Sequence, residues 1–562
     1  MKLIIKEYLS LLKESKELDV LVPDLLLSMG IEVISYPQSG LRQYGVDVLA
    51  FDSNKQELLV FTVKQGDINR SDWDSSEQSV RQSLNDIKDV YLNTHIDSRY
   101  SSVNKKIIVC TGGELKQSVQ QNWSGYIKQN PISNTEYEFW GGDKLALLVE
   151  KHMLNEHIFP TALQSLFRRT LVLLPDSDYD LSDFYKLLDM LILSEDFGNL
   201  SKDKNLRKAI KSIKIINLSL SIIYHWSIKQ NNIKPLVYVA EKVVLTLWEF
   251  IRKNDLYNNK NIIKIFTQNY QNLLSNYSDY FIKIEKHLHV KNGLNGYGQN
   301  TLLENINIFE QLGIISTAGL MHYFHVFNSD DIKSQQASVK SAKVLKDSVK
   351  ALITNHLSTN SPCYDNHIVE ITQTILLLYY CDELDFIDKW IKEIITHVSF
   401  AYEMGRNFPI ESDSFDDLIA LNISGETEKE ELMQTSTLLP ILAQLSSIFD
   451  LEKSYSLIKL NVDKYFSKTN LQIWYPNKDT DGFIYNNNAA YESGFMEVPI
   501  SIPKNIEEMK NMINKIQEKT VKNEEISSID KGLFILPIIA SRHYRTPILP
   551  VYWQSILTIH NQ

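Results

Sequence analysis

Apolar and polar residues follow two different patterns along the chain, and the change comes near residue 160. Before it, short runs rich in β-branched and aromatic residues are separated by turns and by stretches with helical spacing. The predicted strands lie in MGIEVISYP (29–37), GVDVLAFD (45–52), LLVFTVK (58–64), KKIIVCTGG (105–113) and EYEFW (136–140). Residues 78–93 place apolar side chains at steps of three and four and predict a helix. Strands that alternate with helices predict a sheet flanked by helices.

After Phe159-Pro160 the pattern becomes helical. No glycine occurs between Gly198 and Gly293, and Pro235 is the only proline in that stretch. Because these two residue types interrupt helices most strongly, long helices are expected. Similar patterns recur at 300–327, 336–357, 366–403 and 435–460, without a fixed repeat length. The prediction is an α/β domain over 1–165 and an all-α region over 166–562, an irregular bundle or solenoid, with a loop-rich insertion at 465–502.

Composition narrows the class of protein. The 562 residues are 43% hydrophobic and 23% charged, as in ordinary globular proteins, and the net charge is -11. This charge argues against a chain coated in basic surface, although a local basic groove is compatible with it. Three cysteines far apart suit a reducing compartment, and the apolar runs 312–321 and 371–380 are too short to cross a bilayer. Together with a charged N-terminal stretch, these features predict a cytoplasmic protein without a membrane partner.

Two strands carry the candidate chemistry. Metal-dependent cleavage of a phosphodiester needs carboxylates to hold a divalent ion, and a lysine nearby can orient water or stabilise developing charge. Asp47 and Lys64 could meet these needs from adjacent strands. Thr62 stands two residues before the lysine, so both side chains point to the same face of their strand. A carboxylate in place of Thr62 would complete a metal site.

These residues, in this order, resemble the PD-(D/E)xK restriction-endonuclease-like superfamily, and within it the Mrr-type branch found in bacterial anti-phage defence nucleases. The resemblance covers about residues 1–160. It rests on LDVLVPDLLLSMGIEV (18–33), GVDVLAF (45–51), FTVK (61–64), IIVCTGG (107–113) and FWGGDKLALLVEKHM (139–153).

The resemblance implies a magnesium or manganese site. Asp47 and Asp19 would hold the ion, Lys64 would aid the attacking water, and Thr62 would contribute an oxygen. The Val63 carbonyl could supply another. Asp19 stands where the family usually has glutamate, and it could instead cap a helix that begins at Pro23. In that case Glu17 and Asp67 are the reserve acids.

The same resemblance implies DNA as substrate, with Gln65, Arg70 and Arg81 as candidate contacts to it. Trp73, in the same stretch, is expected to pack in the domain. The helical region would restrain cleavage until a partner defence protein (such as an ATPase) or a phage component arrives, and homo-oligomerisation stays open.

Two alternatives remain. Thr62 and the acidic net charge also fit a degenerate nuclease fold that binds DNA or a partner protein without cutting. More simply, Asp47 could cap a strand turn, Lys64 could be a solvated lysine at a strand end, and Thr62 could only fill its strand. Elsewhere, NKDTDGFIYNNN (477–488) resembles a calcium loop but ends in Asn488, so a tight acidic turn is expected. His322 and His325 share a helical face without an acid or cysteine to complete a zinc set.

Overall fold

The computed structural model describes residues 2–36, 44–76, 78–153, 159, 161–176, 179–295, 301–326, 331–424, 429–486, 493–520, 522 and 525–546. The chain divides into two compact units, Met1–Leu236 and Val237–Gln562. The division falls inside a helix, α11 (Lys234–Lys253). The change of pattern near residue 160 therefore lies within the first unit, which contains both the sheet and the first helices of the helical region.

A five-stranded mixed sheet forms the N-terminal part, as predicted. Its strands follow the chain in the order β1-β2-β3-β4-β5. The first three are antiparallel to one another, and β4 and β5 continue parallel to β3. The bounds are β1 (Glu32–Ser35), β2 (Val48–Asp52), β3 (Glu57–Lys64), β4 (Asn104–Thr111) and β5 (Thr135–Trp140). The end of β3 therefore lies between β2 and β4, where side chains of three strands meet.

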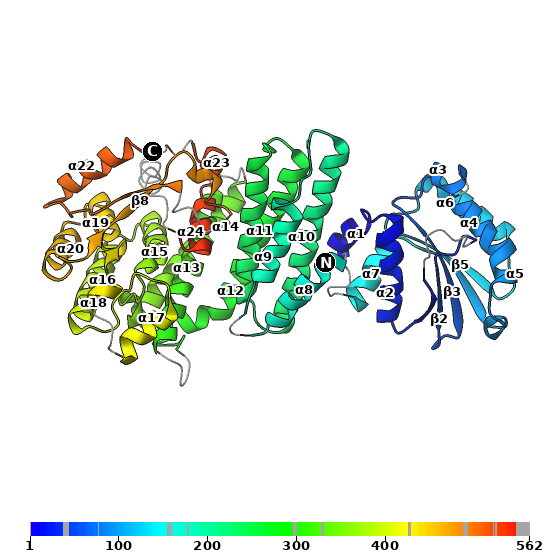
Figure 1. Cartoon of the computed structure of the whole chain (residues 1–562), viewed down its shortest axis with the longest axis horizontal. Helices are drawn as coiled ribbons and strands as arrows, with labels where there is room; N and C mark the ends of the chain where they lie inside the picture. Colours follow the sequence, from blue (N-terminus) through cyan, green and yellow to red (C-terminus); the bar gives the residue numbers. More distant parts are fainter. Residues whose placement is uncertain are drawn as a thin grey trace. The chain divides into compact units, whose positions relative to one another are not determined.

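Helices cover both faces of this sheet (Figure 1). On one side lie α1 (Lys2–Leu9), the π-helix η1 (Glu14–Leu18), α2 (Asp19–Ser28) and α7 (Gly142–His152). On the other lie α3 (Arg70–Asp74), α4 (Val80–Asp86), the π-helix η2 (Ile87–Tyr91), α5 (Leu92–Thr94) and α6 (Gln117–Gln129), with a 3₁₀ turn at Ser98–Tyr100. The result is the sheet flanked by helices that the apolar pattern indicated.

Successive side chains along each strand point to opposite faces of the sheet, so each face has its own core. Val60 of β3 and Val109 of β4 pack in one core with Leu84 of α4 and Val119 of α6. Trp73 joins this core, with its ring edge-on to Trp123 at 6.4 Å and Tyr126 at 6.0 Å. The expectation that Trp73 packs in the domain is confirmed.

The remaining helices of the first unit follow the sheet. They are α8 (Thr161–Leu173), α9 (Ser182–Leu188), the π-helix η5 (Asp189–Leu193) and α10 (Asp203–Lys229). Within this unit α10 packs against α1, so the helical region meets the sheet domain on the side of α1.

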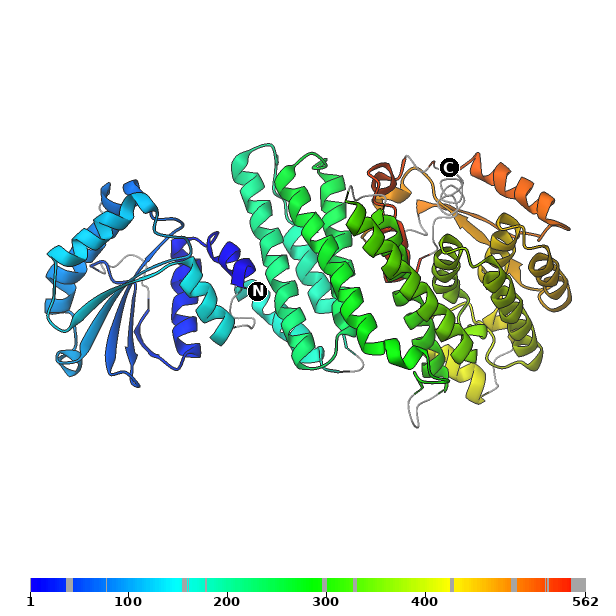
Figure 2. The same ribbon diagram turned by 180° about the vertical axis from the view of Figure 1, so that it is seen from behind.

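The second unit is mainly helical (Figure 2). Its α-helices after α11 are α12 (Lys260–Leu288), α13 (Thr301–His325), α14 (Ile332–Asn355), α15 (Ile368–Tyr380), α16 (Leu384–Met404), α17 (Phe415–Ile419), α18 (Lys429–Leu432), α19 (Leu438–Ile448), α20 (Glu452–Tyr465), α22 (Ile506–Gln517), α23 (Ser527–Asp530) and α24 (Leu536–Tyr544). The shorter turns are 3₁₀-helices at Leu357–Asn360, Asp365–His367 and Thr480–Gly482, and a π-helix at Ala420–Ser424.

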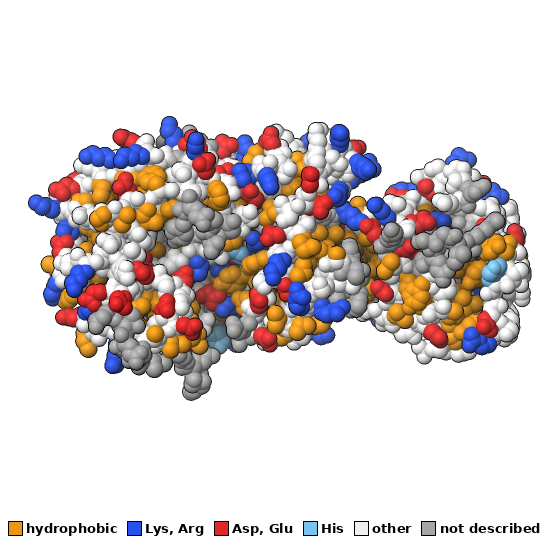
Figure 3. Space-filling view, in the orientation of Figure 1, with side chains coloured by type: hydrophobic (Ala, Val, Ile, Leu, Met, Phe, Trp, Pro, Cys, Tyr) orange, Lys and Arg blue, Asp and Glu red, His pale blue; other side chains and the backbone are white. Residues whose placement is uncertain are grey.

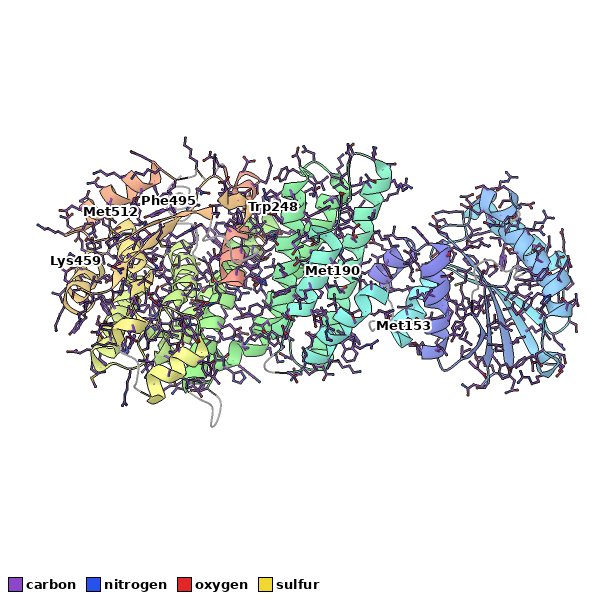
Figure 4. All side chains as sticks on the ribbon, viewed as in Figure 1. Met153, Met190, Trp248, Lys459, Phe495 and Met512 are labelled. Atoms are coloured by element: carbon purple, nitrogen blue, oxygen red, sulfur yellow. The ribbon has the colours of Figure 1, made fainter. Side chains whose placement is uncertain are left out.

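The predicted insertion at 465–502 contains short strands. β7 (Asn470–Leu471) pairs with β6 (Thr435–Ser436), and β8 (Ile473–Tyr475) pairs with β9 (Phe495–Glu497). Trp248, labelled in Figure 4, is buried on α11 and donates its Nε1–H to Ser527 Oγ at 3.3 Å. In the part of the chain that is described, no helix combines the length and apolar character needed to span a bilayer.

Side chains of both signs are mixed on the surface. Figure 3 shows basic and acidic side chains interspersed over the face it draws. This mixture agrees with the acidic net charge and with the absence of a uniformly basic coat.

Candidate functional site at the ends of β2 and β3

Asp47 stands immediately before β2 and is fixed there by the neighbouring strand. Its backbone N–H donates to the Phe61 carbonyl at 2.8 Å. Its carboxylate Oδ2 accepts the backbone N–H of Val63 at 2.6 Å. The side chain thus replaces a carbonyl in the hydrogen-bond ladder beside β3. It does not cap a turn, because the turn between β2 and β3 lies at the other end of the hairpin, where Asp52 accepts the N–H groups of Asn54 and Lys55. The other carboxylate oxygen of Asp47 is left for a further partner.

Lys64 ends β3 and is largely enclosed, with only 13% of its side chain exposed. The alternative of a solvated lysine is therefore wrong. Its Nζ lies 4.0 Å from Oε1 of Glu14 on η1. Glu14 was missed from the sequence, although ESKELD (14–19) is an acidic stretch next to the expected site helix. Nothing in the spacing alone indicates which of its three acids faces the strands.

Asp19 begins α2 and does not cap a helix at Pro23, because Pro23 lies inside that helix. The backbone N–H of Asp19 donates to the carbonyl of Glu14, so the π-helix η1 runs directly into α2. Oδ1 of Asp19 is buried and has no hydrogen-bond partner. Since an unsatisfied buried oxygen is costly, this atom is a candidate ligand for an ion.

Lys64, Glu14 and Asp19 all act on the pKa of Asp47. Burial raises the pKa of Asp47 to about 6. The Val63 N–H and the charge of Lys64 lower the pKa, while the charges of Glu14 and Asp19 raise it further. Among the side chains that the structure describes, three carboxylates and one lysine therefore act at this place. Such an excess of negative charge in a partly buried place favours a bound cation.

Thr62 does not join this hydrogen-bonding. Its side chain is 0% exposed, and its Oγ1 is buried without a partner. It occupies the β3 face of Val60, and its register partner on β4 is Val109. The hydroxyl is thus an unsatisfied group beside an apolar core, and the structure gives it no bond to Asp47.

The two reserve acids are engaged elsewhere. Both oxygens of Glu17 accept from Lys211 Nζ of α10, at 2.5 and 2.6 Å. Asp67 accepts the Glu114 N–H at 2.9 Å and pairs with Lys116 at 2.7 Å, and that lysine lowers the pKa of Asp67.

The candidate DNA contacts lie just beyond Lys64. Gln65 and Arg70 are exposed on the loop after β3 and at the start of α3. Arg81 on α4 pairs with Asp74 at 2.7 Å, and both side chains are about half exposed. A surface pair of this kind is weak and leaves the guanidinium accessible to a phosphate.

Asp47 and Asp19 are the candidate side-chain ligands for a divalent ion of the magnesium type. In the described ranges, no group of three or more His, Cys, Asp or Glu side chains is arranged to hold a metal. Magnesium, however, is commonly held by one or two carboxylates and completes its shell with water and substrate phosphate. The buried orphan oxygen of Asp19 and the second oxygen of Asp47 would supply those two carboxylates.

The other motifs do not form a site of this kind. His322 lines a cavity of about 410 Å³ between α12, α13 and α14, and burial lowers its pKa to about 4. In the acidic turn, Asp481 accepts from both the N–H and Oγ of Ser527. The expectation of a structural turn at 477–482 is supported by this bond, while Asn488 lies outside the described residues.

Comparison of the chain with protein-family models, curated proteins and solved structures gives no match. The case for a function therefore depends on the geometry around Asp47 and on the residues that carry the family resemblance.

Proposed function

We propose that the chain is a metal-dependent DNA endonuclease, an effector of bacterial anti-phage defence regulated by its helical region. The observation that carries the proposal is the meeting of Asp47, Asp19, Glu14 and Lys64 where β2 begins and β3 ends. The defence setting, DNA as substrate and a partner such as an ATPase or a phage component follow from the family resemblance alone.

In this proposal each residue has a defined task. Asp47, oriented by the Val63 N–H, and Asp19, with its unpaired oxygen, bind Mg²⁺ or Mn²⁺. The bound ion would polarise the phosphate and lower the pKa of the attacking water. Lys64, held in a largely enclosed position, stabilises negative charge that develops on the phosphate. Gln65, Arg70 and Arg81 contact the DNA backbone.

Thr62 favours the second candidate, a nuclease fold that binds DNA or a partner without cutting. Its hydroxyl is buried and unpaired where the family has a carboxylate or an amide, so the proposed side-chain ligands are Asp47 and Asp19. If two carboxylates are too few for catalysis, binding would remain while hydrolysis is lost.

Plasmid cleavage separates the two candidates. The full chain is incubated with supercoiled DNA and Mg²⁺ or Mn²⁺, in parallel with Asp47→Ala and Lys64→Ala. Nicking or linearisation by the wild type that both variants lose supports the endonuclease. Equal traces for all three proteins would reject it, and DNA retention in a mobility-shift assay without cleavage would favour the binder.

A matched variant guards against a folding artefact. Lys55→Ala changes an exposed lysine of the β2–β3 turn that pairs with Asp52 at 3.5 Å, far along the hairpin from Lys64. It should cut as the wild type does. Loss of cutting in this variant as well would show that the assay reports stability of the hairpin and not the chemistry of the site.

A further inference from the structure

The π-helix η1 is held from two sides. On the side of the site, Glu14 approaches Lys64 at the end of β3. On the other side, Glu17 lies three residues later and binds α10 through Lys211. Asp19 follows at once as the first residue of α2. A single turn therefore carries two acids toward Asp47 and one acid toward a helix of the helical region.

The contact with α10 is well built for a charged pair. The side chains of Glu17 and Lys211 are only 23% and 22% exposed, and Nζ bonds to both carboxylate oxygens. Glu17 also accepts the backbone N–H of Lys13 at 2.7 Å, which fixes the start of the turn. Lys214, further along α10, lies 3.8 Å from Glu7 of α1. Lys211 therefore joins α10 to η1, and Lys214 joins α10 to α1.

In the described residues η1 is one of four five-residue π-helices, with η2, η5 and Ala420–Ser424, so its π geometry does not by itself mark a site. What distinguishes η1 is its position: a shift of η1 would move Glu14 and Asp19 relative to Asp47 and Lys64. Groups that orient metal ligands from the second layer typically change metal affinity when they are lost.

We propose that Lys211 is a positioning residue, and that α10 controls the metal site by holding Glu17 and with it the turn that presents Glu14 and Asp19. The inference rests on the proposed metal site at Asp47. It identifies the route by which the helical region regulates that site: a partner that moves α10 away from η1 lowers the affinity for the ion.

Titration calorimetry with Mn²⁺ on the full chain tests the proposal. Lys211→Met keeps the aliphatic chain and removes the charge, and we expect affinity about 10-fold weaker than in the wild type. The matched control is Lys208→Met on the same helix, because Lys208 pairs with Glu195 and lies over the ring of Phe197, both outside the turn. Exchanging the two charges, with Glu17→Lys and Lys211→Glu together, should restore most of the lost affinity.

Recovery of affinity in the charge-exchanged double variant gives a readout that a merely structural role of either side chain would not produce. It requires the ion pair between positions 17 and 211, so each single exchange alone should stay weak. If Lys211→Met does not fold, Glu17→Gln takes its place, since the amide oxygen still accepts the Lys13 N–H.

The outcomes separate this inference from the proposed function. If wild type binds Mn²⁺, Asp47→Ala does not, and Lys211→Met matches the wild type in affinity, the role of Lys211 is refuted while the metal site stands. If the wild type shows no Asp47-dependent binding, the metal site fails and the role of Lys211 fails with it. Weakening in Lys211→Met but not in Lys208→Met supports the proposal.

Discussion

At the residue scale, Asp47 is a carboxylate whose charge is disfavoured in the folded protein. Its pKa rises from 3.8 to about 6, first because of burial. Below about pH 4 the carboxyl is protonated in both the folded and unfolded states, so its burial does not lower the free energy of unfolding. Between pH 4 and 6 the unfolded chain ionises first, so stability falls as pH rises. Above pH 6 the carboxylate is charged in both states, and the full loss of stability from burying that charge is present.

The first prediction follows from this sign. Asp47→Asn keeps an oxygen for the Val63 N–H and removes the charge. We expect it to be more stable than the wild type at pH 7.5, by on the order of 1–3 kcal/mol. The advantage should shrink to nearly zero at pH 4. Urea unfolding at the two pH values measures it, and a constant difference would mean that burial of Asp47 is not its origin.

Thr62 gives the second prediction. Removing an unsatisfied buried hydroxyl without changing the shape of the side chain is neutral or stabilising, so Thr62→Val should raise stability by about 1 kcal/mol. It should leave Mn²⁺ binding unchanged, because the hydroxyl has no bond to the site in this structure. Thermal unfolding and calorimetry check the two halves. Weaker Mn²⁺ binding in Thr62→Val would instead show that Thr62 supplies an oxygen, as the family resemblance implies.

At the scale of elements, the loop after β3 and the loop after β4 pass in close backbone contact where Gly66 faces Gly113. A Cβ on Gly113 would lie 2.3 Å from the carbonyl carbon of Gly66 and 2.4 Å from the nitrogen of Asp67. Both are backbone atoms, so no side chain can move aside to relieve the clash. The loop that leaves Lys64 therefore depends on glycine at this crossing.

The third prediction uses this crossing. Gly113→Ala should destabilise the first unit by about 1–3 kcal/mol and weaken Mn²⁺ binding, because it displaces the chain next to Lys64. Gly125 of α6 is the matched control, since a Cβ there has nothing within 4 Å. Gly125→Ala should stabilise by roughly 0.5–1 kcal/mol. Equal effects of the two substitutions in thermal unfolding would contradict the crossing as their cause.

The same elements show what sequence patterns could predict. The β-branched runs indicated all five strands, and the glycine pairs after β4 and β5 marked their ends, because these signals are local. Glu14 and the partner of Glu17 were not predictable. The pattern of ESKELD gives no sign of a π turn, and Lys211 lies 194 residues from Glu17. The long side chain of Lys64 looks solvated from its position at a strand end, and only the fold shows that it is enclosed.

At the scale of the whole molecule, a buried ionic cluster holds the far end of the described chain to the second unit. Glu241 on α11 is 0% exposed and accepts from Arg542 of α24 and from Tyr277 of α12. His543 Nδ1 lies 3.1 Å from its other oxygen, and burial keeps the pKa of His543 well below its usual value. The neutral imidazole therefore serves as a hydrogen-bond partner, and the charge of Glu241 is balanced by Arg542.

The fourth prediction is that removal of the Glu241 charge lowers the stability of the second unit and leaves that of the first unchanged. Glu241→Gln removes the buried carboxylate that accepts from Arg542, and breaking a buried ion pair in this way typically costs about 3–5 kcal/mol. Each unit has its own core, so hydrogen exchange in mild denaturant should quicken in α11, α12 and α24 while β2, β3 and β4 keep wild-type rates. Exposed Glu403→Gln on α16 should change neither. Faster exchange in the strands as well would contradict this prediction. It would show that the two units, whose division falls inside α11, unfold as one cooperative body. The proposed regulation of the site at Asp47 would then extend to the second unit.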